Sequence, residues 1–458
     1  MHPICNRLSQ PGSVTEHMPV SMFGFGRLSA EGKIGIASGV VFFSMLMSRT
    51  LISERVDIGT RASLFRVQFL LFINSLLLLG SLYIWKRVGR RLCGTRSAPS
   101  VPQRCWRLLV LLFLTLVHGS YLCMFFLVDT EPHWFSILSF SCLGIYVILL
   151  FFLFVFGCLN RLRRLLSRRR GEEDAVASAS ASQTVLALIV TAILAVYGLV
   201  NAAQPPRVIE VEIPVEKLPE SLNGLRLVLL SDIHLGPTVG RSKLQRIVTM
   251  VNELNPDVVV IVGDLTDSQV TRLRSAAEPL GQMRARLGSY FATGNHDYYT
   301  ADVEGWFELL RSMGIESLHN SNVKVFRPER TQDWICLAGI DDLEARMLRY
   351  PGHGMDVEKA LSGCSAESPI ILLAHQPHAA KQALQQRPDI SLVLSGHTHA
   401  GQLFPLTILA FLMNPFFCGL YRVSEHTMVY VTSGTGYYGI PMRIASRSEI
   451  TNIILKRA

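Results

Sequence analysis

Apolar and charged positions are unevenly distributed along this chain of 458 residues, and uncharged apolar runs are concentrated in its first 200 positions. About 20 consecutive apolar residues are needed to cross the hydrocarbon core of a bilayer. Four runs meet or approach this length without a charged side chain, whereas a fifth, Ile34–Ser48, is closely bracketed by Lys33 and Arg49. We therefore expect about five transmembrane helices, near residues 34–48, 67–85, 108–128, 135–159 and 185–200.

Basic residues predict how these helices are oriented. Residues 1–200 contain 20 Lys and Arg against 9 Asp and Glu, whereas the remainder contains 24 against 26. Most of the excess lies in Lys86–Arg107, which has seven basic residues and no acid, and in Arg161–Arg170, which has six Arg. Loops rich in Lys and Arg stay on the cytoplasmic side, so everything after Asn201 is predicted to be extracytoplasmic: periplasmic, lumenal or extracellular. Membrane lipids with anionic headgroups, and not nucleic acid, are the expected partners of these loops.

The second half of the chain has a different pattern, in which short apolar runs alternate with amphipathic segments. Leu225–Leu230 and Val258–Val262 are typical of strands buried on both faces, and Ser242–Leu254 between them is typical of a helix. This alternation predicts an α/β domain. We therefore expect a membrane region over residues 1–203 and an α/β domain over residues 204–458.

Five polar motifs follow apolar runs of this second half. They are Asp232-Ile233-His234, Gly263-Asp264, Gly294-Asn295-His296-Asp297, Ala374-His375 and Gly396-His397-Thr398-His399. Residues that follow the carboxyl ends of strands converge at one edge of an open α/β sheet. The Asp, Asn and His side chains then form a ligand set for two adjacent divalent metals, in which Asp264 is the expected bridging carboxylate. Mixed oxygen and imidazole ligands suit Mn, Fe or Zn better than Ca.

In their order and spacing these motifs resemble the calcineurin-like metallophosphoesterase superfamily, and within it a membrane-linked branch. The resemblance covers residues 205–458, includes the signature G-H-T-H-x-G-Q at Gly396–Gln402, and extends to Pro441-Met442-Arg443. It implies a four-layer sandwich of two mixed sheets flanked by helices. It also implies a role for each site residue: Asp232, His234 and His399 would hold one metal, Asn295, His375 and His397 the other, and Asp264 would bridge them. His296 would act as a general acid toward the leaving group or stabilise charge on the phosphate, oriented by Asp297.

Other features of the second half leave alternatives open. The uncharged run Leu403–Leu420 is either a packed core element or a membrane-facing lip beside the site. Asp267 is either a carboxylate behind the site or a solvated turn residue. Cysteines at 336, 364 and 418 show no metal-binding spacing and predict no disulfide framework.

The predicted activity is metal-dependent hydrolysis of a phosphoester. We expect a phosphodiester or pyrophosphate bond in a lipid or another envelope or lumenal component. The alternatives are a phosphomonoester or phosphoprotein substrate, and a non-catalytic membrane scaffold that retains the fold. The complete ligand set favours catalysis, because a buried cluster of polar groups is costly to keep without a use. Nothing in the sequence indicates an oligomeric state.

Overall fold

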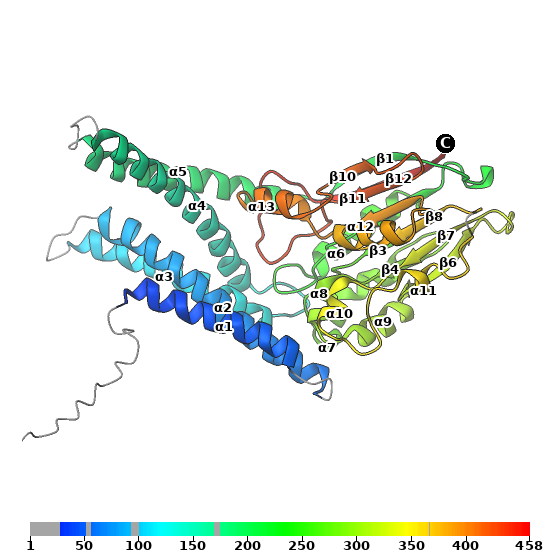
Figure 1. Cartoon of the computed structure of the whole chain (residues 1–458), viewed down its shortest axis with the longest axis horizontal. Coiled ribbons are helices and arrows are strands. Elements are labelled where there is room, and N and C mark those ends of the chain that lie inside the picture. The colour runs from blue at the N-terminus through cyan, green and yellow to red at the C-terminus, as the bar shows by residue number, and fades with distance from the viewer. Residues whose placement is uncertain (1–27, 52–55, 93–99, 169–174, 366) are drawn as a thin grey trace, which may run out of the picture.

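The chain folds as a bundle of long helices followed by an α/β domain (Figure 1). The computed structural model describes residues 28–51, 56–92, 100–168, 175–365 and 367–458. The long helices of the bundle are α1 (Ala30–Leu51), α2 (Ile58–Ile84), α3 (Val101–Phe126), α4 (Trp134–Arg168) and α5 (Ala175–Ala203). Each contains a stretch that is long and apolar enough to cross a membrane, including the marginal candidate near residues 34–48. The chain is therefore a multi-pass membrane protein.

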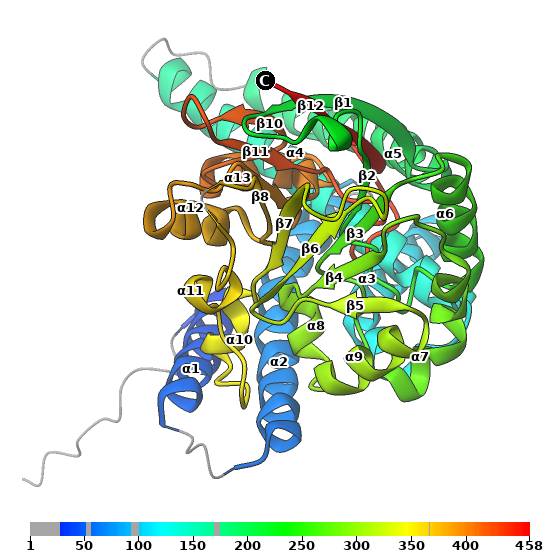
Figure 2. The ribbon, with the colours of Figure 1, turned by 90° about the vertical axis from the view of Figure 1, so that its right-hand side faces the viewer.

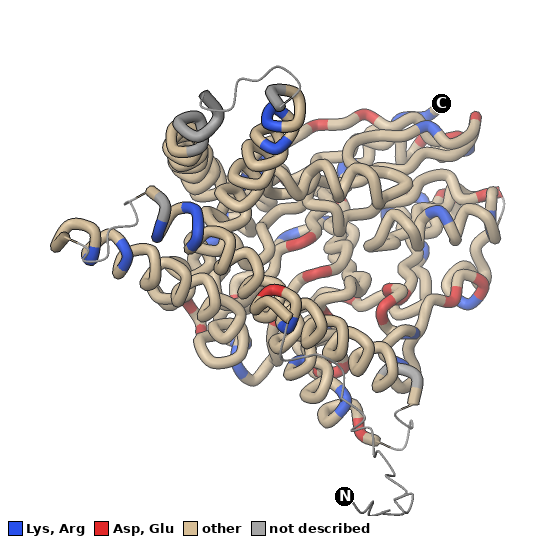
Figure 3. The backbone as a smooth tube through the Cα atoms, turned by 60° about the vertical axis from the view of Figure 1, so that its left-hand side comes forward, with Lys and Arg blue, Asp and Glu red and all other residues tan. Residues whose placement is uncertain are grey.

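Basic residues gather at the end of the bundle that lies away from the α/β domain (Figure 3). The turn of π-helix that follows α2, the start of α3 and the end of α4 share this end. The basic residues there are Lys86, Arg87, Arg90, Arg104, Arg107, Arg161, Arg163 and Arg164. Lys86 pairs with Glu31 in the first turn of α1. Consequently α1, α3 and α5 run toward the α/β domain, and α2 and α4 run away from it.

Two mixed six-stranded sheets make up the α/β domain (Figure 2). The first sheet has the order β1-β12-β2-β3-β4-β5, and the second has the order β10-β11-β9-β8-β7-β6. Strands β2, β3 and β4 are parallel to one another, as are β7, β8 and β9. The strands are β1 (Arg207–Val215), β2 (Arg226–Leu230), β3 (Val258–Val262), β4 (Ser289–Ala292), β5 (Ile315–Ser317), β6 (Ser321–Phe326), β7 (Trp334–Gly339), β8 (Ile370–Leu373), β9 (Leu392–Ser395), β10 (Gly419–Arg422), β11 (Met428–Val431) and β12 (Glu449–Arg457).

The two sheets face each other across a shared apolar core. Side chains from β2 and β3 of the first sheet pack there against side chains from β8 and β9 of the second. The outer face of the first sheet is covered by α6 (Arg241–Glu253), α7 (Val270–Ala277) and α9 (Val303–Ser312). The outer face of the second sheet is covered by α11 (Val357–Ala360) and α12 (Pro377–Gln386). This arrangement confirms the predicted four-layer sandwich.

The α/β domain packs directly on the helix bundle at two glycines. A Cβ atom on Gly144 of α4 would lie 2.7 Å from Met442 Sδ and 2.8 Å from Cγ2 of Ile440. A Cβ atom on Gly198 of α5 would lie 2.8 Å from Cγ1 of Ile444. Small residues let two segments approach closely where lipid offers no hydrophobic driving force. The loop that contains Ile440 and Met442 therefore sits against the membrane helices.

Basic side chains of the α/β domain cap the ends of the membrane helices that reach it. The Arg272 guanidinium donates to the Phe125 carbonyl (2.7 Å) and to the Val128 carbonyl (3.3 Å) at the end of α3. Lys243 Nζ donates to the Ala202 carbonyl at the end of α5 (3.1 Å). The last carbonyls of a helix lack partners within the helix and carry partial negative charge, so cations stabilise them.

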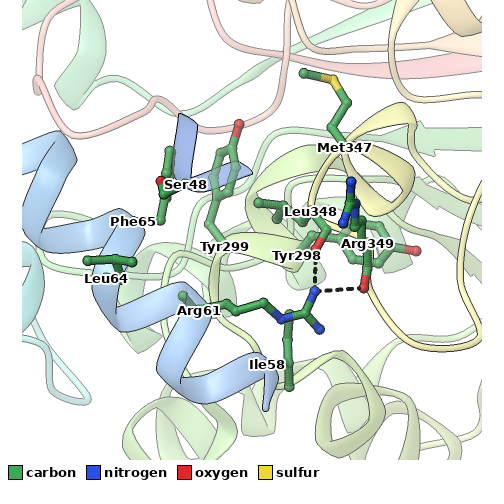
Figure 4. A pocket seen from close by; sticks show the side chains of 11 residues that line it. Ser48, Ile58, Arg61, Leu64, Phe65, Tyr298, Tyr299, Met347, Leu348 and Arg349 are labelled. Carbon is green, nitrogen blue, oxygen red and sulfur yellow. Dashed lines mark hydrogen bonds between the residues drawn. The ribbon is translucent and has the colours of Figure 1, made fainter. Parts of the chain in front are cut away.

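A basic side chain of the bundle in turn binds backbone carbonyls of the α/β domain. Arg61 of α2 reaches the α/β domain and donates through Nη1 to the carbonyls of Leu348 (3.3 Å) and Arg349 (3.2 Å), as Figure 4 shows. These carbonyls lie just after α10 (Leu343–Met347). The first turns of α2 are thereby held against the side of the domain that also carries α8 (Asn295–Tyr299).

The cysteine prediction was wrong, because Cys336 and Cys364 form a disulfide in the structure. Cys336 lies on β7, and Cys364 follows α11, which packs on the same face of the second sheet. The two Cα atoms are 5.8 Å apart, within the usual range for a disulfide. Sequence spacing gave no signal because the chain brings the two thiols together only through the packing of α11.

The run Leu403–Leu420 is packed in the core at its ends and exposed between them. Leu403 is buried, and Phe416 packs against the outer core of the second sheet. Between them, α13 (Leu406–Met413) has no buried residue. Leu412 is 73% exposed and Met413 is 64% exposed. The ends of the run are therefore core elements, whereas α13 presents an uncharged apolar surface.

Candidate metal centre

Five strands from both sheets deliver the predicted site residues to one edge of the sandwich. Motifs that follow β2, β3 and β4 come from the first sheet, and motifs that follow β8 and β9 come from the second. Parallel neighbouring strands place these motifs side by side. The seven predicted metal ligands come together in this way. They are Asp232, His234, Asp264, Asn295, His375, His397 and His399.

The first cluster consists of Asp232, His234 and His399, whose ligand atoms all lie within 4.8 Å of one another. The Nε2 atoms of His234 and His399 are 3.1 Å apart, and His399 Nε2 is 3.3 Å from Asp232 Oδ1. All three side chains are buried. Three converging donor atoms of this kind, two nitrogens and a carboxylate oxygen, suit a divalent metal such as Mn, Fe or Zn.

The second cluster consists of Asp264, His375 and His397, with Asn295 beside it. His375 Nε2 lies 3.2 Å from Asp264 Oδ2, and His397 Nδ1 lies 2.9 Å from Asn295 Oδ1. The same Asp264 oxygen lies 3.6 Å from His234 Nε2 in the first cluster. Asp264 therefore stands between the two groups, where a carboxylate shared by two cations is expected.

His375 provides a direct test of whether a metal fits. Its Nδ1 is 2.8 Å from the Val262 carbonyl, which can only accept, so Nδ1 carries the proton. Its Nε2 is buried and faces Asp264 Oδ2 at 3.2 Å, but without a proton it cannot donate to that carboxylate and has no hydrogen-bond donor among the described residues. A buried polar atom without a partner is costly, and an imidazole whose other nitrogen donates to a carbonyl is the usual form of a metal ligand. The residues present therefore fit a metal ion.

Burial and neighbouring charges shift the pKa values of the cluster in both directions. Burial lowers the pKa of His397 to about 4. Burial and the adjacent His234 ring hold the pKa of His399 well below its ordinary value. Burial alone would raise the pKa of Asp264, but the rings of His375 and His296 outweigh it and hold that pKa well below the usual range. Burial alone would lower the pKa of His375, but the Asp264 carboxylate outweighs it and holds that pKa well above its ordinary value. A bound cation would favour neutral imidazoles beside an ionised carboxylate.

The backbone at the site is held in an unusual conformation. Five of the predicted ligands have positive φ angles, which non-glycine residues rarely adopt. They are Asp232 (55°), His234 (55°), Asp264 (53°), His397 (69°) and His399 (50°). Close approach also requires glycine, because a Cβ atom on Gly294 would overlap Asp264 Oδ1. Strain of this kind persists only where the surrounding structure enforces it, and it clusters at functional sites.

His296 lies beside the first cluster, with a side chain that is 16% exposed. Its Nδ1 is 2.9 Å from Asp267 Oδ1, and the same oxygen is 2.9 Å from His234 Nδ1. Although burial raises the pKa of Asp267, the two histidines outweigh this and bring it to about 2. Asp267 thus fixes the orientation of a metal ligand and of His296 together, which settles its two predicted alternatives in favour of a carboxylate behind the site.

The prediction that Asp297 orients His296 is not supported by the geometry. The Asp297 carboxylate accepts hydrogen bonds from backbone N–H groups instead, namely those of Gly294, Asp264, Leu265 and Thr266. These bonds tie the motif after β4 to the motif after β3. Asp297 therefore shapes the loops that carry the predicted ligands. Asp267, and not Asp297, orients the His296 imidazole.

Arg443 is a further site residue whose position the motifs did not reveal. It is fully buried, and it donates to the carbonyls of His399 (3.0 Å), Ser433 (2.8 Å) and Gly436 (2.6 Å). Burial lowers its pKa to about 10. The guanidinium thereby holds the backbone of His399 in place. The motif Pro441-Met442-Arg443 was the available sequence signal, but it did not indicate a contact with the metal ligands.

Two pockets open from the site toward the membrane helices. The α2–α3 pocket, of about 440 Å³, lies between α2, α3 and the Asp267–Arg272 loop. The α4–α13 pocket, of about 310 Å³, lies between α3, α4 and α13 and includes Asp264, His397 and His399 in its lining. Both pockets share four lining residues, Tyr121, Asn295, His296 and Tyr438. The metal centre therefore faces the helix bundle.

Comparisons with known proteins agree with this geometry. Residues 225–401 match the family model described as calcineurin-like phosphoesterase. A Danio rerio protein named "Transmembrane protein with metallophosphoesterase domain" is 90% identical over 437 residues, which cover 95% of this chain and 100% of that protein. The chain belongs to the calcineurin-like metallophosphoesterases.

Other relatives extend the similarity to different depths. A Bos taurus protein with the same name is 54% identical over 442 residues, covering 95% of this chain and 99% of the relative. A Helicobacter pylori protein named "Uncharacterized metallophosphoesterase" is 35% identical over 258 residues, covering 56% of this chain and 66% of the relative. With its His and Asp clusters, this member of the metallophosphoesterases is a metal-dependent phosphoesterase linked to a membrane.

Proposed function

We propose that this metallophosphoesterase hydrolyses a phosphodiester or pyrophosphate bond with a metal-activated water, on the extracytoplasmic side of its membrane. The supporting observation is that the metal centre lies between two pockets that share His296 and Asn295. A phosphodiester or a pyrophosphate carries one substituent on each side of the reacting phosphorus. Two pockets that meet at the metal ligands provide a place for each substituent, whereas a monoester needs only one.

The chemistry follows from the positions of the side chains. Two bound divalent cations would supply a deprotonated water and offset the negative charge of the phosphate. In our assignment the first is held by Asp232, His234 and His399, the second by Asn295, His375 and His397, and Asp264 lies between them. Asp267 holds Nδ1 of His296, so that Nε2 is the nitrogen available to the substrate.

The bond changes balance without any further reactant. The water oxygen forms a bond to phosphorus while the bond from phosphorus to the leaving oxygen breaks. His296 donates a proton to that leaving oxygen and later recovers one from solvent. A diester thus yields a monoester and an alcohol, and a pyrophosphate yields two phosphates.

Three observations support an extracytoplasmic α/β domain. The basic residues lie at the opposite end of the bundle (Figure 3). Five spans from an N-terminus on the cytoplasmic side place everything after α5 on the other side. The disulfide between Cys336 and Cys364 is typical of an oxidising compartment. Protease added to sealed vesicles tests this topology: digestion of the α/β domain from the cytoplasmic face would contradict it.

Activity is tested with the purified full-length protein loaded with Mn²⁺ or Zn²⁺. We expect a higher kcat/KM for a chromogenic phosphodiester than for the matching monoester, and loss of both activities in Asp264→Asn. A preference for the monoester would favour a phosphomonoesterase. A protein that is inert with every metal, or unaffected by Asp264→Asn, would indicate a non-catalytic scaffold.

A further inference from the structure

The walls of the α4–α13 pocket come from both halves of the molecule. Phe140 and Leu143 belong to α4, whereas Leu406 and Ala410 belong to α13. Ile440, from the loop that packs on Gly144, adds to the same wall. Apart from the site residues themselves, this pocket is lined almost entirely by apolar groups. An apolar pocket of this kind accommodates a hydrocarbon chain.

The depth of α13 can be measured along α4 from its basic end. Phe404, just before α13, packs against Phe151 with ring centroids 5.2 Å apart. Phe151 lies ten residues before Arg161, which is about 15 Å along a helix that rises 1.5 Å per residue. The hydrocarbon core of a bilayer is about 30 Å thick. If Arg161 marks the cytoplasmic boundary, Phe404 lies near the middle of the bilayer, and α13 lies within the outer leaflet.

The exposed surface of α13 matches such an environment. None of its residues is buried by protein, and no charged residue occurs between Leu403 and Tyr421. Large apolar surfaces of this kind are rare where water is the solvent. Figure 1 shows α13 beside α4 and α5, on the side of the domain that faces the bundle. Lipid is therefore the solvent that this surface fits.

The α2–α3 pocket lies at a shallower level and is more polar. Arg66 of α2 lines it, twenty residues before Lys86 at the basic end, which is about 30 Å along the helix. That is the level of the outer headgroups. Arg66 donates through Nη2 to the carbonyls of Tyr299 (3.1 Å) and Thr300 (2.9 Å). A guanidinium has five N–H donors, so its other nitrogens remain available for a phosphate or polar headgroup.

We propose that the substrate is a membrane lipid with a phosphodiester or pyrophosphate headgroup, which enters sideways from the outer leaflet between α4 and α13. Its acyl chains occupy the α4–α13 pocket, and its headgroup extends past His296 into the α2–α3 pocket beside Arg66. The reacting phosphorus then lies at the predicted metal ligands, which line the α4–α13 pocket and border the α2–α3 pocket. This inference rests on the proposed function and adds the substrate class and its direction of entry.

A matched pair of substitutions on α13 tests the chain pocket. Ala410→Trp would fill it, whereas Leu412→Trp, on the same helix, adds the same ring on the lipid-facing side. The full-length protein is reconstituted with Mn²⁺ in phosphatidylcholine vesicles that contain dioleoyl phosphatidylglycerol, phosphatidylethanolamine or diacylglycerol pyrophosphate. A soluble dibutyryl form of each lipid and a chromogenic diester are measured in parallel.

We expect at least one long-chain lipid to be hydrolysed faster than its dibutyryl form. Ala410→Trp should lower that turnover at least about tenfold, as expected when a hydrophobic pocket no longer fits its ligand, and it should spare the chromogenic diester. Leu412→Trp should leave both activities unchanged. Equal loss on the lipid and the chromogenic diester, or no effect of Ala410→Trp on the lipid, would overturn the inference.

A binding measurement separates this inference from the proposed function. A phospholipid with a photoreactive diazirine near the end of its acyl chain is irradiated in vesicles with Asp264→Asn. Labelling of α13 and of the Phe140–Leu143 segment is expected, and it should decrease in Ala410→Trp. Labelling without any hydrolysis by the metal-loaded wild type would contradict the proposed function, but it would still support a lipid-binding pocket beside α13. If the protein hydrolyses the chromogenic diester but neither hydrolyses any of the lipids nor is labelled by the photoreactive lipid, only the lipid inference is contradicted.

Discussion

The metal centre of the α/β domain and the boundary between this domain and the helix bundle are stabilised in very different ways. In the domain, strands with continuous burial deliver seven ligand side chains to one edge, and five of these residues have strained left-handed backbones. The bundle contacts the domain at separate points instead: close approach at Gly144 and Gly198, and cations that bind backbone carbonyls at the ends of α3, α5, α8 and α10. Rigid elements hold catalytic groups precisely, whereas contacts at separate points leave room for pockets between the helices and the domain.

This difference divides the work between the two regions. The domain determines which bond can be hydrolysed, because every residue that we assign to a metal or to the leaving group belongs to it. In our proposal the bundle supplies the walls through which a substrate reaches these residues, because α2 and α3 line the α2–α3 pocket and α3 and α4 line the α4–α13 pocket. Substitutions around the metal centre should therefore affect all substrates alike. Substitutions at the boundary should affect lipids more than small esters.

The largest effect is expected from Gly294→Ala, because the added Cβ would overlap Asp264 Oδ1. Displacing the shared carboxylate by about 1 Å should lower kcat about 100-fold on lipid and soluble substrates alike. Gly281→Ala is the matched control, since its Cβ would lie 3.6 Å from the nearest side chain, Met313. Metal content by mass spectrometry and kcat check this pair. A variant that loses activity on lipid alone would break the proposed division of work.

Asp267→Asn should have a smaller effect within the domain. The amide keeps an acceptor oxygen but loses the negative charge of the carboxylate that contacts His234 and His296, and hydrogen bonds to a charged group are about twice as strong as neutral ones. Loss of such a partner typically costs about 10- to 100-fold in metal affinity or activity. We expect a lower kcat and a weaker metal titration, with an unchanged KM for the chromogenic diester. A rise in KM alone would mean that Asp267 contacts the substrate and does not position the two rings.

The sequence predicted which polar residues come together at the site, because each of them follows its own strand. Apolar runs such as Val258–Val262 marked the strands, and the parallel order of the sheet then brought the motifs together. Asp267 was harder to assign, because a carboxylate three residues after Asp264 is also a common turn residue. Asp297 was misjudged, since only the fold shows that its oxygens face the backbone N–H groups of two loops.

The boundary between the two regions could not be predicted in the same way. Apolar composition in Leu403–Leu420 is the same whether a residue is exposed, as in α13, or packed against protein, as is Phe416. Contacts such as Arg272 with the end of α3 join residues far apart in the chain without any motif. A glycine such as Gly144 carries no sign of the Met442 side chain that packs against it. These features depend on tertiary packing, which local patterns do not record.

At the boundary, Gly144→Leu should separate the two regions. The side chain would meet Met442 and Ile440, and overpacking of this kind costs about 1–3 kcal/mol. We expect a lower Tm and several-fold slower lipid hydrolysis, with normal metal content. Gly39→Leu on α1 is the control, since a Cβ there meets nothing within 4 Å. Loss of bound metal in Gly144→Leu would show that the bundle also shapes the metal centre, which would break the comparison.

The smallest effect is expected from Leu412→Asp, which places a charge on the exposed face of α13. A carboxylate in the outer leaflet costs less than one at the bilayer centre, about 1 kcal/mol near the interface, so lipid turnover should fall about fivefold. The chromogenic diester should be hydrolysed at the wild-type rate, because Leu412 does not line the α4–α13 pocket. Gln385→Asp on α12, which is also exposed, controls for added charge. If both substitutions slow lipid turnover equally, α13 is not in the bilayer, and its apolar surface requires a protein partner instead.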